Sequence, residues 1–264
     1  MTLAARPGDF RSELRRTWEL ATALAIRSLR VRYRATLLGQ VWWVVRPLAM
    51  GFILWFALGK VLRVGVEHYP LFLMAGLYPW FWFESTVSGS ADVLVGNSGL
   101  IRKAVFPRFV LPLTSVLTGT FQFMYTLPVI LLFAAVSGET PGLTWLVALP
   151  VLLIVQISLL MGLAPLVASL NVFFRDVGPM VEVAMRLLFY GTPIIYPLSR
   201  VPHAFRPLVL LNPMTSVIEG WRDMVMTNTF AGADLWPALV ISAGALVLGL
   251  GIFRMTEKHF ADAL

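Results

Sequence analysis

Six long apolar segments follow an amphipathic N-terminal stretch in this sequence. Each apolar segment is close to the ~20 residues that a helix needs to cross a bilayer, so we predict six transmembrane helices. They lie near residues 41–62, 71–94, 109–136, 143–170, 179–197 and 235–253.

The N-terminal stretch has a helical period instead of a uniformly apolar composition. Its charged residues, among them Arg15 and Glu19, lie mostly opposite an apolar face. That face consists of Phe10, Leu14, Trp18, Ala21, Leu24 and Ala25. The pattern predicts a helix lying on the membrane surface, with a solvated helix packed on a partner protein as the alternative.

Charged residues interrupt the apolar pattern before and within the predicted fifth span. An adjacent Arg175-Asp176 pair precedes the span, and Glu182 and Arg186 lie inside it. A charge at the centre of a bilayer costs roughly 2.5–3.5 kcal/mol unless it finds a partner or a wet cavity. We therefore expect this stretch to be functional, and Glu182 and Arg186, four residues apart, to pair within one helix.

Composition agrees with a membrane protein. The chain is 58% hydrophobic and only 13% charged, with a mean hydropathy of +0.78, which is too apolar for a water-soluble domain of 264 residues. We expect one all-α integral membrane domain over 1–264, made of a cytoplasmic amphipathic segment (1–36) and a six-span region (37–264). The absence of cysteine from the sequence excludes a disulfide framework, a thiolate metal site and a cysteine nucleophile.

The net charge is +7, and the basic residues lie beside the apolar segments. This distribution favours anionic lipid headgroups over nucleic acid as the counter-charge. With the N-terminus inside, 14 Lys and Arg residues fall on the inner side and 5 on the outer side. The asymmetry predicts that both termini are cytoplasmic.

The region between the fifth and sixth spans is long, rich in proline and only moderately apolar. It begins at Tyr196-Pro197 and ends in a helical pattern with Glu219, Arg222 and Asp223 on one face, where the three can pair. We predict a re-entrant helical hairpin on the outer side, buried in protein. The alternative is an ordinary outer amphipathic helix with a surface ion pair.

The inner segment between the second and third spans mixes basic and apolar side chains. We interpret it as a docking surface in which charges fix the register and apolar residues fill a partner's groove. A simple positive-inside anchor is the alternative. The residues concerned are Asn97, Leu100, Arg102, Lys103, Phe106 and Pro107, with Ile101 and Val105 also expected to be exposed.

Six motifs in this order resemble the membrane subunit of ABC-type polysaccharide exporters, the permease family for O-antigen, teichoic acid and capsule export. They are LLGQVWWVVRPL (37–48), GLYPWFWFES (76–85), NSGLIRKAVFPR (97–108), NVFFRDV (171–177), TPIIYP (192–197) and LNPMTSVIEGWRD (211–223).

This resemblance implies a homodimeric permease in the bacterial cytoplasmic (inner) membrane, working with two separate ABC ATPase subunits on a lipid-linked polysaccharide. The chain has no GxxxxGK[ST] phosphate-binding motif, so ATP and Mg would be bound by the partner ATPase and no cofactor by this chain. By the same resemblance, residues 97–108 would be the coupling helix that docks on the ATPase, helped by the N-terminal helix and the Arg175-Asp176 corner.

A path for a long glycan should be aromatic and wet, because sugar rings stack on aromatic faces while their hydroxyls need polar partners. Interfacial aromatic belts are the alternative explanation for many of these residues. Arg186 has the charge to contact the pyrophosphate of a lipid-linked substrate, and it could also face a subunit interface. The candidate lining residues are Trp80, Trp82, Phe83, Glu84, Tyr125, Arg186 and Tyr190.

Two other functions fit less well. A membrane-embedded transferase acting on lipid phosphates would need clustered acids or a positioned base, whereas the three histidines are far apart and no acidic cluster is evident. An ABC permease for a small lipid or a drug would share the fold but not need a long aromatic path.

Overall fold

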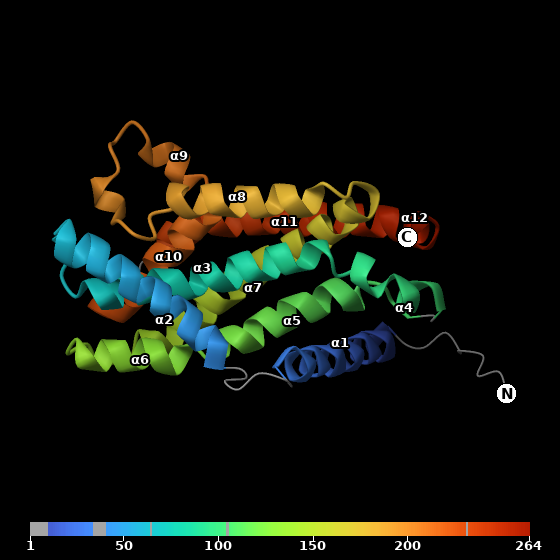
Figure 1. The fold of residues 1–264 in the computed structure, drawn as a ribbon, viewed down its shortest axis with the longest axis horizontal. Coiled ribbons are helices and arrows are strands. Elements are labelled where there is room, and N and C mark those ends of the chain that lie inside the picture. The colour runs from blue at the N-terminus through green and yellow to red at the C-terminus, as the bar shows by residue number, and fades with distance from the viewer. Residues whose placement is uncertain (1–9, 34–40, 64, 104–105, 231) are drawn as a thin grey trace.

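A computed structural model describes residues 10–33, 41–63, 65–103, 106–230 and 232–264. Within these ranges every regular element is helical, and the long helices run side by side along the long axis of the molecule (Figure 1). The long helices are α2 (Trp42–Leu54) with the π-helix η2 (Trp55–Val61), α3 (Tyr69–Ala91), α5 (Val110–Met124), α6 (Leu127–Val136), α7 (Trp145–Phe173), α8 (Val177–Gly191) and α11 (Trp236–Thr256).

Shorter helices lie at the two ends of this bundle (Figure 1). One end carries η3 (Val95–Asn97), α4 (Ser98–Lys103), η7 (Glu257–His259) and α12 (Phe260–Ala263). The other end carries η4 (Leu198–Arg200), α9 (Arg206–Leu210), α10 (Pro213–Arg222), η5 (Asp223–Thr227) and η6 (Gly232–Leu235). The described loops that were counted as inner lie at the first of these ends, and the loops that were counted as outer lie at the second.

Five of the six predicted segments correspond to a single helical stretch, and the third, which is also long and apolar enough to cross a membrane, contains a break. Residues 109–136 form two helices that break at Tyr125-Thr126. The Thr126 hydroxyl donates to the Phe123 carbonyl at 2.7 Å, and Pro128 lies in the first turn of α6, where its missing N–H costs no helical hydrogen bond.

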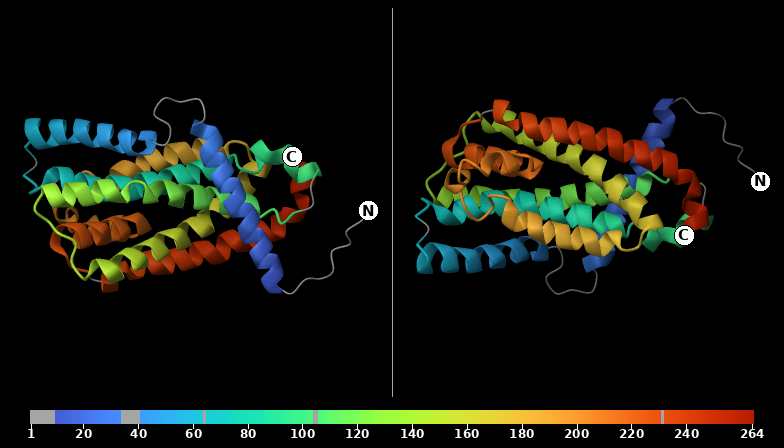
Figure 2. Two further views of the ribbon diagram at one scale, coloured as in Figure 1. Left: turned by 90° about the horizontal axis from the view of Figure 1, so that it is seen from below. Right: turned by 90° about the horizontal axis from the view of Figure 1, so that it is seen from above.

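Four helical stretches in the described part are long and apolar enough to cross a membrane: 44–61, 110–136, 145–173 and 236–263. The chain is therefore an integral membrane protein. α3 and α8 run alongside these four (Figures 1 and 2). α8 has only 15 residues, and the Tyr, Trp and Ser residues of α3 lower its hydropathy.

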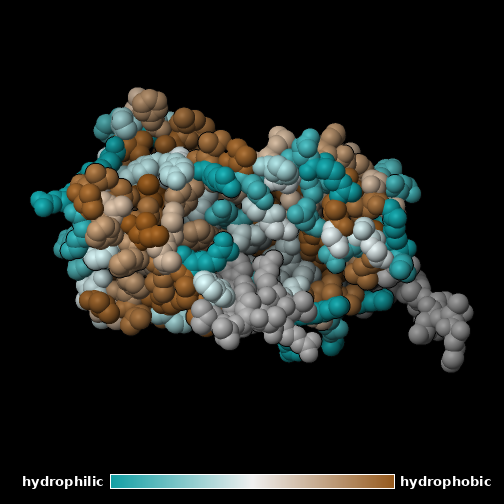
Figure 3. All heavy atoms as spheres, in the orientation of Figure 1, coloured by the Kyte–Doolittle hydropathy of each residue, from teal (hydrophilic) through white to brown (hydrophobic). Residues whose placement is uncertain are grey.

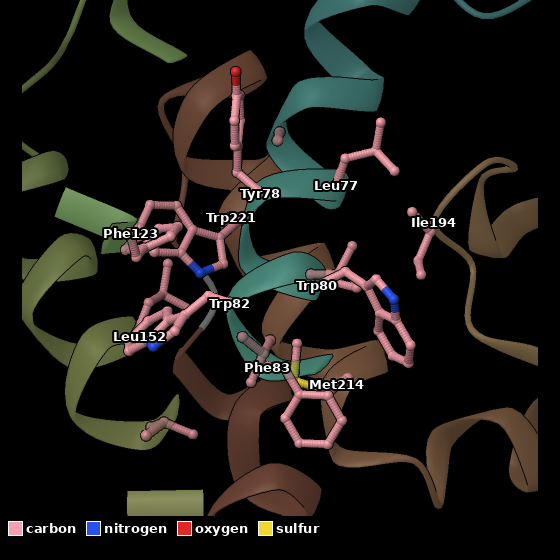
Figure 4. Close-up of a cluster of buried hydrophobic side chains, with 14 of the residues drawn as sticks. Leu77, Tyr78, Trp80, Trp82, Phe83, Phe123, Leu152, Ile194, Met214 and Trp221 are labelled. Carbon is pink, nitrogen blue, oxygen red and sulfur yellow. The ribbon is translucent and has the colours of Figure 1, made fainter. Parts of the chain in front are cut away.

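α3 is the centre of the bundle, with most of its side chains buried. Trp82 on α3 stacks on Phe123 of α5 with ring centroids 4.6 Å apart, and Phe123 meets Trp221 of α10 edge-on at 5.2 Å (Figure 4). These ring contacts join three helices from distant parts of the sequence.

α7 and α11 pack closely through glycines. A Cβ placed on Gly249 would collide with the backbone of Gly162 on the neighbouring helix. Small residues at such positions let two membrane helices approach until their backbones touch.

The amphipathic helix α1 (Phe10–Tyr33) crosses the other helices at a steep angle (Figure 2). Ala21 and Ala25 are buried, and Val110 and Leu113 of α5 pack in the same cluster as Ala21. Trp18 is 55% exposed, so the predicted apolar face is shared between the bundle and the surroundings. The side chains of Phe10 and Leu14 lie outside the described residues.

Candidate functional site

The predicted docking segment projects from one end of the bundle. Leu100, Arg102 and Lys103 of α4 are exposed, as are Asn97 and Pro107 on either side. Two expectations for this segment were wrong. Ile101 is buried with Leu94, Val172 and Phe253, and Phe106 is half-buried, because these side chains attach the short helix to the bundle. Val105 lies outside the described residues.

Arg175 and Asp176 lie exposed at the same end, in the turn between α7 and α8. Buried Asn171 holds this turn against the end of α3. Its amide nitrogen donates to the Ala91 carbonyl at 2.9 Å, and its amide oxygen accepts from the Gly178 backbone N–H at 3.0 Å. The two predicted parts of the docking surface, distant in sequence, are thereby brought to one face of the protein.

A polar cavity of about 400 Å³ opens between α2, α3 and α8. Arg46 comes from α2, Glu84 from α3, and Glu182 and Arg186 from α8; Ser85 and Ser88 add hydroxyls. Hydrophilic side chains interrupt the apolar surface in the middle of this face (Figure 3). Four ionisable side chains this far from either end of a membrane protein require water, a partner or a ligand.

The predicted pairing of Glu182 with Arg186 is not found. No ion pair within 4.0 Å joins them, although both lie in the described part of α8. Both side chains are exposed and line the polar cavity instead. Water in this cavity would remove the need for a neutralising contact inside one helix.

The aromatic candidates divide into two groups. Trp80, Trp82 and Phe83 are at most 4% exposed and belong to the core of the single chain, where Trp80 also meets Phe189 edge-on (Figure 4). In this structure they offer no surface to a passing polymer, contrary to the expectation. Tyr125 and Tyr190 are exposed, at 48% and 66%. Hydropathy could not separate the groups, since a core and a lipid-facing surface are both apolar.

The segment after α8 is fastened by a buried arginine. The guanidinium of Arg222 donates to the Pro193 and Ile194 carbonyls, both at 2.6 Å, and pairs with Glu219 at 2.6 Å. It also lies 3.5 Å from the centroid of the Phe72 ring. The predicted Glu219–Arg222 pair is confirmed, and its arginine side chain is buried.

Asp223 makes no ion pair in the described structure, so the predicted trio is only a pair. Tyr196 is partly buried, and its hydroxyl donates to the Tyr190 carbonyl at 3.0 Å. Pro197, also partly buried, leads into η4.

The described residues contain no group of three or more His, Cys, Asp or Glu side chains that could hold a metal.

Sequence reasoning did not assign three residues that the geometry makes central. Arg46, Asn171 and Asn212 entered it only as members of the motifs 37–48, 171–177 and 211–223. Asn212 caps α10 by accepting from the Met214 backbone N–H at 3.0 Å and donates to the Thr192 hydroxyl at 2.6 Å. A polar residue inside or beside an apolar segment was the available signal for each.

Comparison with known proteins places the chain in a family. The ABC-2 type transporter model matches residues 19–226. The O-antigen export system permease protein RfbA of Klebsiella pneumoniae is 35% identical over 94% of this chain and 95% of its own length. RfbA of Myxococcus xanthus is 32% identical over 93% and 95%, and the polysialic acid transport protein KpsM of Escherichia coli is 25% identical over 89% and 93%. The chain belongs to the ABC-2 type transporter membrane family.

Proposed function

We propose that this chain is the permease subunit of an ABC exporter, and that two copies form the path by which a lipid-linked cell-surface polysaccharide crosses the membrane. The observation that carries the proposal is the polar cavity of Arg46, Glu84, Glu182 and Arg186 on the face of α2, α3 and α8. Placing four ionisable groups against membrane lipid is energetically costly, whereas a hydrated path between two copies would accommodate them. The relatives named for O-antigen export indicate the class of cargo.

We assign six spans to the helical stretches that begin with α2, α3, α5, α7, α8 and α11, and a re-entrant hairpin to the segment from Thr192 to Thr227. Burial of α10 among α3, α7 and α11 supports the hairpin. In this assignment the end with α4 and α12 faces the cytoplasm of a bacterium and the membrane is the inner one. The excess of basic residues at that end supports the orientation.

Energy would come from two ABC ATPase subunits, which bind ATP and Mg. Their docking surface on this chain is the exposed set of Leu100, Arg102 and Lys103 together with Arg175 and Asp176. Ile101 anchors α4 to Phe253 of α11 and Leu111 of α5, so a push on α4 is transmitted to the bundle. ATP-driven closure of the ATPase pair would in this way open the path.

Within the path, Arg46 and Arg186 provide positive charge for the pyrophosphate of the lipid carrier. Glu84, Glu182, Ser85 and Ser88 offer acceptors and hydroxyls to sugars. Tyr190, exposed on the same helix as Arg186, offers a ring face on which a sugar can stack.

The cargo is tested by depleting the chain in its host. We expect lipid-linked glycan to accumulate inside the cell and surface glycan to fall, and a chain carrying Arg46→Gln and Arg186→Gln should not restore export. Lys60→Gln, an outer cation outside the cavity, is the control and should restore it. Normal surface glycan after depletion would contradict the proposal, and accumulation of a small lipid or drug would favour the other class of ABC permease.

The docking surface is tested separately by co-purification with the ATPase. Reversing two charges with Arg102→Glu and Lys103→Glu should weaken complex formation by about tenfold or more, because both side chains are exposed and free to contact a partner. Arg63→Glu, exposed at the opposite end, is the control. Unchanged complex formation and ATP hydrolysis in the double variant would refute the assignment.

A further inference from the structure

A second cavity, of about 760 Å³, lies at the opposite end from the docking surface, between the hairpin and the start of α11. It takes no part in the proposed path, whose ionisable groups come from α2, α3 and α8. Most of its wall is apolar. The wall residues that concern us are Leu210, Leu211, Trp236 and Val240.

Three carboxylates also line this cavity: Glu219, Asp223 and Asp234. Glu219 is neutralised by Arg222, whereas Asp223 and Asp234 make no ion pair among the described residues. Asp223 and Asp234 are close enough to repel each other. The cavity therefore has an excess of negative charge beside an apolar wall.

Ser216 adds an independent sign of a ligand. The residue is only 5% exposed, its hydroxyl has no hydrogen-bond partner, and it lines the same cavity. A buried hydroxyl without a partner costs about 1–3 kcal/mol, so such groups usually meet a ligand or water. Here the hydroxyl belongs to a residue that lines the same cavity as Asp223 and Asp234.

We propose that this cavity binds a phospholipid whose headgroup ends in a primary ammonium, of the phosphatidylethanolamine type. The ammonium would donate to Asp223, Asp234 and the Ser216 hydroxyl, which can accept as well as donate. An acyl chain would lie along Leu211, Trp236 and Val240, which are all more than 60% exposed in the single chain.

The chemistry selects this lipid over others. An anionic headgroup would be repelled by the two unpaired carboxylates, and a trimethylated ammonium has no N–H to donate. A soluble amine or amino sugar would leave the apolar wall uncovered. An amphiphile whose head ends in a primary ammonium satisfies both halves of the cavity.

The test is lipid retention by the full-length chain, extracted from membranes and measured by native mass spectrometry. The probes are phosphatidylethanolamine, phosphatidylglycerol and phosphatidylcholine with identical acyl chains. Wild-type protein should retain phosphatidylethanolamine about tenfold better than either of the others. Asp223→Asn combined with Asp234→Asn should remove most of that preference, and Ser216→Ala should reduce it.

Glu67→Gln is the matched control, because Glu67 is an acid near the same end whose side chain is 91% exposed and outside the cavity. It should leave the preference unchanged. Equal retention of the three lipids by wild-type protein would overturn the proposal without any variant having to fold. So would an unchanged preference in the double aspartate variant. Neither readout uses glycan export or ATP, so the proposed transport function stands or falls separately.

Discussion

α8 and α10 lie on either side of the same proline-rich segment, yet their surroundings are opposite. In α10, seven of ten residues are buried, including Arg222 and Trp221. In α8, only Met185 and Phe189 of fifteen residues are buried. The more apolar of the two helices is the exposed one.

The difference shows that each helix uses its charges for a different purpose. Arg222 is enclosed and closes a turn by binding two backbone carbonyls, so its role is to fix the chain. Glu182 and Arg186 are exposed in a cavity, and no ion pair joins them. Apolar exposure alone is expected against lipid, so these two charges are what favour α8 as a face of the proposed path.

We expect the largest difference between the two helices when the arginine of each, Arg222 in α10 and Arg186 in α8, is replaced by methionine. Arg222→Met should destabilise the protein by on the order of 3–5 kcal/mol, because Glu219 and two buried carbonyls lose their partner. Arg186→Met should leave the thermal unfolding temperature nearly unchanged and reduce export. Unfolding in detergent and surface-glycan analysis measure the two effects. Equal thermal stability of the two variants would contradict the contrast.

Replacing one aromatic residue on each helix gives a smaller contrast. Trp221→Leu should cost about 2–3 kcal/mol, since the side chain is fully buried against Phe123 and the leucine leaves a cavity. Tyr190→Leu should cost less than about 1 kcal/mol, because that ring is mostly exposed and contacts Phe189 at its edge. The same unfolding assay measures both losses of stability. A larger loss of stability from Tyr190→Leu than from Trp221→Leu would contradict the assignment of Trp221 to the core and Tyr190 to the surface.

The glycines of the two helices give the smallest contrast. Gly220→Val should cost about 1–2 kcal/mol, since its new Cβ would lie 2.8 Å from Cδ2 of Leu152. Gly191→Val meets nothing within 4 Å and should change stability by less than about 0.5 kcal/mol. If both changes are tolerated equally, α10 is less tightly enclosed than the structure indicates.

Hydropathy predicted where the long helices lie, because the cost of exposing a peptide group to lipid makes every apolar segment helical. It did not predict the break at Tyr125-Thr126, since both sides of the break are apolar. The positive residues correctly grouped the loops that share an end of the bundle. This grouping depends only on the chain crossing from one end of the bundle to the other with each successive span.

The candidate site was less predictable, because its contacts join residues far apart in sequence. Arg222 was expected to pair locally with Glu219, and it does, but its other partners lie 28 and 29 residues away. Trp82 and Tyr190 look alike in the sequence as aromatic residues in apolar segments. Only packing decides that the first meets Phe123 and the second is exposed.

Disulfide cross-linking tests the central claim that α8 faces a second copy across the path. The sequence contains no cysteine, so a cysteine at Leu187, which is 70% exposed on α8, can form a disulfide only with an identical residue in a second copy. Val247→Cys, 74% exposed on α11, is the matched control on a different helix. Oxidation in membranes should give a covalent dimer with Leu187→Cys and little with Val247→Cys. A dimer formed through Val247→Cys but not through Leu187→Cys would contradict the account.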